Sequence, residues 1–317
     1  MHRLKSFVIR LDFLAFVCGV LIALQARVNG ELSYQLNNSL QAAFVSFSSG
    51  LIVIILLVFF SRSIRLGLSK LVMSYQRKEI RLWSFIGGVL GGNLIAIQTF
   101  ILPKIGVAVF SVGSIAGQTC ISLLVDKLGI TGGGKQGITL RRIFAAVITV
   151  SAVLISVLNR INVQTLSVFL VTLAIVSGSI IGVQRALNGK LNEYSNQIFA
   201  TTFINFVGGT GILGIYLLFV SLIQGNKLEP LKIHPIWMYS GGVIGIVYIA
   251  FAATIVQNLG VLVFTLYSVG GQLMGSLILD LVLPVEGVEI TYHLVAGIVL
   301  TFLGVFVGGV RSSRLKR

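Results

Sequence analysis

Charged residues are scarce in this chain, and acidic residues are the scarcest. Asp, Glu, Lys and Arg make up 10% of the 317 residues, whereas a soluble domain carries about 25%. Nine acidic residues stand against 24 Lys and Arg. The low charge excludes an ordinary water-soluble domain and places the chain in the membrane class.

The residue types that most often do chemistry are also few. The chain has two Cys and three His, and their positions match neither a disulfide framework nor the ligand spacing of a metal site. Residues 129–136, GITGGGKQ, have the glycine and lysine spacing of a phosphate-binding loop but lack the Ser or Thr that follows the lysine. We therefore expect no enzyme activity, no metal and no cofactor.

Long apolar runs fill most of the chain, in which 56% of the residues are hydrophobic. A helix needs about 20 apolar residues to cross a bilayer, and no run shows the alternation of a membrane β-strand. Ten segments predict spanning helices: 12–30, 39–60, 82–102, 106–126, 142–159, 165–187, 199–223, 236–257, 260–281 and 293–310.

The positive charges indicate the orientation. If the N-terminus is cytoplasmic, 19 of the 24 Lys and Arg fall in cytoplasmic segments and 5 outside, as the positive-inside rule requires. We therefore expect both termini in the cytoplasm, the first apolar run kept as a span, and no nucleic-acid partner.

The chain also repeats itself. A shift of 159 residues, and of 154 beyond a shorter loop, superposes the two halves at many positions, among them Gln25, Asn29, Gly91, Gln118 and Asp126 on Gln184, Asn188, Gly245, Gln272 and Asp280. Five spans per copy is an odd number, so the second copy enters the membrane inverted. Residues 1–161 and 162–317 are thus predicted to be inverted five-helix repeats of one compact unit, an architecture common in secondary transporters.

Two polar stripes run along the fourth and ninth predicted spans. Their spacing of three and four residues places each set on one helix face. The stripes comprise Ser111, Ser114, Gln118, Ser122 and Asp126 in the first copy, and Thr265, Ser268, Gln272, Ser276 and Asp280 in the second. They either line a substrate pathway or hydrogen-bond neighbouring helices as packing contacts.

Further polar residues lie within or at the ends of the spans. Gln25, Asn29, Gln184 and Asn188 are expected to form a second polar layer, and Gln98, Asn205 and Tyr248 to contribute to the pathway. Arg27 and Arg185 either reach the lipid phosphates or surround a substrate. Asp126 and Asp280 are either carboxylates at helix ends or gates. The Asn-Gly pairs at 29–30 and 188–189 can alternatively end helices.

The segments LQARVNGEL, AFVSFSSG, IGGVLGG and GVAVFSVGSIAGQTCISLLVD, with their second copies, resemble the YdcZ-type family of the drug/metabolite transporter superfamily. The resemblance implies a bacterial inner-membrane carrier of ten helices that exports a small molecule. Proton-exchanging multidrug members have a buried Glu on the first helix, where this chain has Gln25 and Gln184, so proton coupling is not implied.

These patterns predict a secondary transporter of a small metabolite or drug-like molecule. A scaffold that transports nothing and a small-solute channel are the alternatives. The substrate, the direction and the choice between monomer and homodimer are left open by the sequence.

Overall fold

The computed structural model describes residues 2–131, 133–156, 168–224, 231, 235–282 and 292–309. Every regular element in these ranges is a helix. The elements are α1 (His2–Leu36), α2 (Ser39–Phe60), α3 (Arg62–Gln76), η1 (Leu82–Ile86), α4 (Gly87–Leu128), α5 (Leu140–Ser156), α6 (Val168–Ser195), α7 (Ile198–Gln224), η4 (Ile236–Tyr239), α8 (Gly241–Leu259), α9 (Val261–Val282) and α10 (Tyr292–Gly309).

Six of the described helices are long and apolar enough to cross a membrane. They are Leu11–Leu36, Ser39–Phe60, Val168–Ser195, Ile198–Ile223, Ile236–Leu259 and Val261–Leu279. The prediction of a helical membrane protein is confirmed. Parts of the predicted spans at 157–159, 165–167 and 310 lie outside the described residues, and the arrangement of ten spans as inverted repeats stays a prediction.

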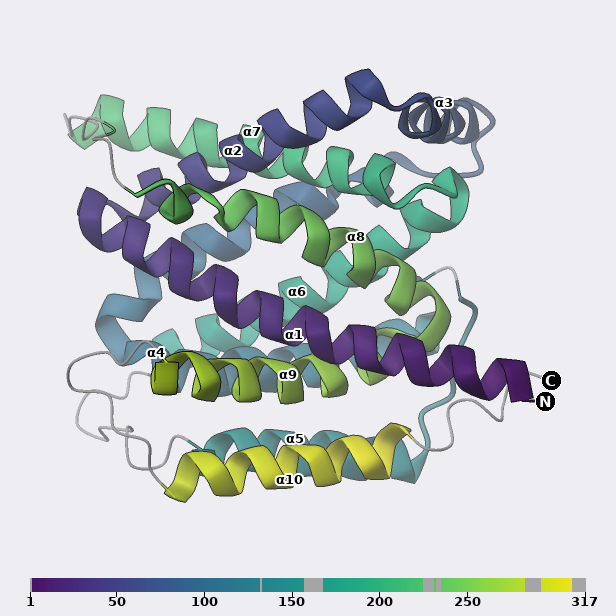
Figure 1. The fold of residues 1–317 in the computed structure, drawn as a ribbon, viewed down its shortest axis with the longest axis vertical. Coiled ribbons are helices and arrows are strands. Elements are labelled where there is room, and N and C mark those ends of the chain that lie inside the picture. Colours follow the sequence, from purple (N-terminus) through teal and green to yellow (C-terminus); the bar gives the residue numbers. More distant parts are fainter. Residues whose placement is uncertain are drawn as a thin grey trace.

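Helix α4 joins two segments, 82–102 and 106–126, that the apolar runs predict as separate spans. Its 42 residues would measure about 63 Å if straight, twice the thickness of the hydrocarbon core. In Figure 1 the ribbon of α4 turns at the left edge of the view, so the helix crosses the molecule in two arms. The corresponding part of the second half is broken into α8 and α9 at Gly260, whose φ of 86° favours glycine.

Other helix limits also differ from those expected. The Asn-Gly pairs lie inside helices, because α1 continues to Leu36 and α6 to Ser195. The basic segment after α2, expected as a loop, contains the amphipathic helix α3. Asn38 caps α2, its side chain accepting the amide hydrogen of Gln41.

Helices from the two halves interlock at close contacts that recur at repeat-equivalent positions. A Cβ on Gly19 of α1 would lie 2.0 Å from the carbonyl oxygen of Ser268 on α9, and a Cβ on the equivalent Gly178 of α6 would lie 1.8 Å from that of Ser114 on α4. Only glycine permits such an approach of two backbones. The first helix of each half therefore packs on a helix of the other half.

The helices form layers in the view of Figure 1. Helices α5 and α10 pair at one edge, α2 and α7 lie at the opposite edge, and α1, α4, α6, α8 and α9 lie between them. The start of α1 and the end of α10 lie on the same side of the molecule (Figure 1). Most of the buried polar residues belong to the middle layer.

Candidate functional site

The guanidinium of Arg185 is buried in the middle layer, where it contacts α4, α8 and α9. Its residue on α6 is 6% exposed. The Nη1 atom donates hydrogen bonds to Oε1 of Gln118 at 2.9 Å and Oγ1 of Thr265 at 3.2 Å, and Nε donates to the hydroxyl of Tyr248 at 3.2 Å. Three residues predicted for the pathway, carried by α4, α8 and α9, thus meet at one arginine.

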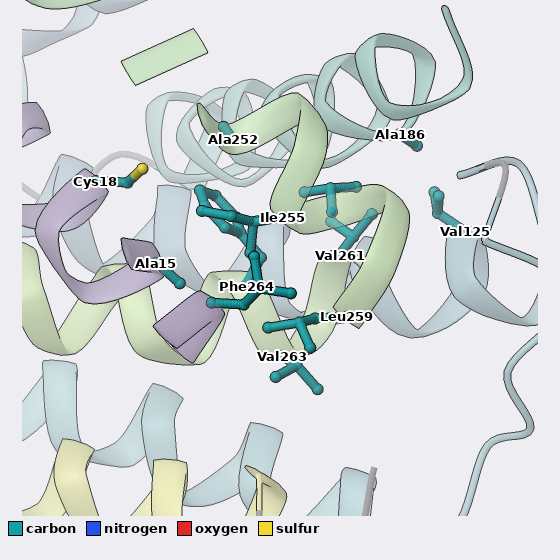
Figure 2. Close-up of a cluster of buried hydrophobic side chains, with 12 residues drawn as sticks. Ala15, Cys18, Val125, Ala186, Ala252, Ile255, Leu259, Val261, Val263 and Phe264 are labelled. Carbon is teal, nitrogen blue, oxygen red and sulfur yellow. The ribbon is translucent and has the colours of Figure 1, made fainter. Parts of the chain in front are cut away.

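An apolar wall covers this arginine. The Cζ atom of Arg185 lies 4.9 Å from the centre of the Phe264 ring, a distance at which the face of an aromatic ring attracts a cation. Figure 2 shows Phe264 close to Ala15, Ile255 and Val263, within a cluster of buried side chains from α1, α4, α6, α8 and α9. Water is therefore largely excluded from the guanidinium.

Two serine hydroxyls extend the cluster along α4. Ser114 accepts a hydrogen bond from Nε2 of Gln118 at 3.3 Å, and Ser122 shares one with Thr265 at 3.3 Å. Ser268 donates instead to the carbonyl of Thr265 in its own helix. The α4 stripe and the start of the α9 stripe therefore meet at Ser122 and Thr265.

Asp126 ends the α4 stripe and is fully buried at the α8–α9 junction. Its Oδ1 accepts the amide hydrogen of Val261 at 2.8 Å and its Oδ2 that of Leu262 at 3.1 Å, which satisfies the free N-terminus of α9. Oδ2 also pairs with Arg142 of α5. The contacts are those of a helix-end carboxylate, and a gating role stays a prediction.

The amides expected to form a second layer lie in two separate places. On α6, Gln184 donates to Asn205 at 3.2 Å, and Asn205 donates to Asn188 at 2.7 Å. On α1, Gln25 donates to the carbonyl oxygen of Gly241 at 2.9 Å, while Oδ1 of Asn29 is buried without a partner. Both sets join helices to their neighbours beside, and not within, the Arg185 cluster.

The remaining predicted residues are less involved. Arg27, Gln98 and Gln272 are half-buried, and the described contacts include no hydrogen bond between Gln118 and Gln272. The side chains of Ser111 and Asp280 lie outside the described residues.

Several participants were missed from the sequence. Phe264 looks like any apolar residue of a span, and Arg142 looks like a loop charge. At one end of the bundle Asn192 donates to Oε1 of Gln257 at 2.9 Å and Oγ1 of Thr254 at 3.3 Å, closing α6 on α8. None of these residues belongs to the polar stripes, so the spacing of the stripes did not predict their contacts.

The described residues contain no group of three or more His, Cys, Asp or Glu that could hold a metal ion. Cys18 is buried and Cys120 exposed, and both are free thiols. In the glycine-rich loop, a Cβ on Gly133 would lie 2.0 Å from the carbonyl oxygen of Gln257, and Gln136 donates to that of Leu259. This loop covers the α8–α9 junction.

Comparison with solved structures shows the fold. A structure described as "Crystal structure of protein" matches with a TM-score of 0.61 at 13% identity, over 98% of this chain and 99% of its own length. No curated protein matches the chain.

Comparison with protein families gives a match in each half. The same family model matches residues 11–155 and again residues 169–307, and its description reads "Putative inner membrane exporter, YdcZ". The double match covers most of the chain and agrees with the resemblance seen in the sequence. The chain therefore belongs to the YdcZ family of the drug/metabolite transporters.

Proposed function

We propose that this protein is a secondary transporter that moves a small molecule across the inner membrane by alternating access. The two inverted repeats would rock against each other around the contacts of α1 with α9 and of α6 with α4. The observation that carries the proposal is the buried polar cluster of Gln118, Ser122, Thr265 and Arg185, which lies where helices of both halves meet. Export is the direction that the family description suggests.

The topology proposed has ten spans and both termini in the cytoplasm. Repeat-equivalent contacts support it: a Cβ on Gly91 would lie 2.5 Å from Nε2 of Gln184, and one on the equivalent Gly245 2.7 Å from Nε2 of Gln25. In this topology the Arg185 cluster, Asp126 and the start of α9 lie toward the cytoplasm.

A difference in exposure between the halves supports alternating access. Gln118 and Ser122 are buried, whereas the equivalent Gln272 and Ser276 are half-buried. In the proposed topology the contacts of Asp126 with α9 and of Asn192 with Gln257 lie on the cytoplasmic side and would hold it closed. The opposite state would break these contacts while closing the outer side. Asp280 would then be the gate equivalent to Asp126.

The competing function is a scaffold in which the polar residues only hold helices together. Most of their hydrogen bonds are satisfied within the protein, as packing contacts would be. A pathway differs because its residues must become accessible to water in one state.

Cysteine accessibility separates these functions. Cys18 and Cys120 would be replaced by Ala, and Ser122→Cys, Ser268→Cys and Leu218→Cys introduced one at a time. We expect charged, membrane-impermeant reagents to modify the cysteines at 122 and 268, and not the one at 218, which is exposed on the apolar surface of α7. Protection of both polar positions in membranes and in detergent would contradict the transporter. Counterflow that does not saturate would indicate a channel.

A further inference from the structure

We propose that Arg185 binds the anionic group, a carboxylate or a phosphate, of the molecule that this protein carries. The inference rests on the proposed transport function and assigns a substrate class to it. It starts from a charge that the surrounding protein does not balance.

No described acidic side chain neutralises Arg185. The one ion pair in the described part of the chain joins Asp126 to Arg142. Asp12 hydrogen-bonds with Tyr267, and Glu31, Glu79 and Glu193 are half-buried or exposed. The partners of Arg185 are an amide, two hydroxyls and an aromatic ring, all neutral. A buried charge without a counter-ion is costly, and a bound anion would remove that cost.

The geometry leaves part of the guanidinium available. Among the described residues, Nε and Nη1 have acceptors while Nη2 has none. A guanidinium presents its donors in a planar fork that matches a carboxylate or phosphate. When the cytoplasmic side opens, an anion could take Nη2 directly and exchange with Gln118 or Thr265 at Nη1.

The comparison of the two halves argues against a purely structural role. The residue equivalent to Arg185 is Ala26, which is exposed. The Gln and Asn residues that flank this position occur in both copies, and α1 packs on α8 and α9 much as α6 packs on α4. Both halves have this helix packing, but only the second half has an arginine at this position. Helix packing therefore does not require the arginine.

The test is the thermal stability of the purified full-length protein at matched ionic strength, with four probes: benzoate, phenyl phosphate, inorganic phosphate and benzylammonium. A ligand that binds the native state raises its Tm. We expect benzoate or a phosphate probe to raise Tm by about 3 °C or more at saturation, and benzylammonium to have no effect. The two anionic chemistries are told apart by which probe acts.

Variants connect the effect to the site. Arg185→Gln should abolish the anion-dependent shift, whereas Lys70→Gln, which removes one positive charge from exposed α3, should keep it. If Arg185→Gln does not fold, Arg185→Lys should retain a weakened shift and Thr265→Val should reduce it. An equal shift in Arg185→Gln, or in both replacement variants, would place the anion elsewhere and overturn the proposal. Stabilisation by benzylammonium alone, or by none of the four, would also overturn it.

Counterflow in liposomes keeps the two proposals apart. Anion binding that depends on Arg185 without any flux would leave the site standing and refute transport. Saturable flux of a cation, without anion binding, would refute the site alone.

Discussion

The two halves of this protein use the same helix contacts for different chemistry. In the second half Arg185 of α6 is buried against α4, α8 and α9, and in the first half the equivalent Ala26 of α1 is exposed. The close contacts of Gly178 with Ser114 and of Gly19 with Ser268 are nevertheless alike. The interlocked scaffold and the polar site are therefore separable, and four sets of substitutions test this separation.

The largest effect is expected at Asp126, the buried carboxylate that joins α4 to α5 and to the start of α9. Asp126→Ala removes the carboxylate that pairs with Arg142 and leaves the amides of Val261 and Leu262 without their acceptor. Removing one partner of a buried ion pair costs about 3–5 kcal/mol, so the free energy of unfolding should fall by about that amount in SDS-induced unfolding. Lys127→Ala, at the exposed neighbouring position, should change little. A loss below about 1 kcal/mol would show that the pair contributes nothing net.

Valine at Gly19 or at Gly178 should destabilise the protein by similar amounts. Each side chain would collide with a backbone carbonyl, and overpacking costs about 1–3 kcal/mol, sometimes more. The same unfolding measurement should give similar losses for Gly19→Val and Gly178→Val. Gly211→Val has open space and is the control. A large effect in one half only would contradict an equivalent scaffold.

The contacts at Asn205 and at the equivalent Ser46 should contribute unequally to stability. Asn205→Ala removes the bridge between Gln184 and Asn188, and we expect the free energy of unfolding to fall by about 0.6–1.7 kcal/mol, from the average to the maximum measured for hydrogen bonds between membrane helices. Ser46→Ala, at the equivalent position in the first half, makes no such bridge and should be near neutral. Equal losses in the two variants would remove the distinction between the halves.

The smallest effect concerns the contact between α6 and α8 that we propose to close the cytoplasmic side. Gln257→Ala deletes a hydrogen bond from Asn192, worth about 0.6 kcal/mol on average in a membrane protein, and so should raise the open population roughly threefold. The rate of modification of Ser122→Cys reports it. Asn258→Ala, next in the chain and exposed, is the matched control, and unchanged modification in Gln257→Ala would contradict the assigned closure.

The helical membrane class could be predicted from the sequence because apolar runs leave a clear signal. The spacing of Gln118, Ser122 and Thr265 placed these residues on polar stripes, whereas Phe264 carries no signal that distinguishes it from other apolar residues of a span. Local backbone conformation could not be predicted. The sequence did not show that α4 continues as one helix while the equivalent segment is divided into α8 and α9. It also did not show that the Asn-Gly pairs lie within helices.

The amino-acid sequence is enough to assign this chain to the lipid bilayer, because backbone hydrogen bonding allows few other uses of such apolar runs. It is also enough to show two related halves. The different positions of the two candidate arginines became apparent from the packed helices alone. They occupy neighbouring columns of the repeat, one residue out of register, and one residue turns a helix by about 100°. That rotation leaves Arg27 half-buried on α1 and directs Arg185 inward, to Gln118, Thr265 and Tyr248.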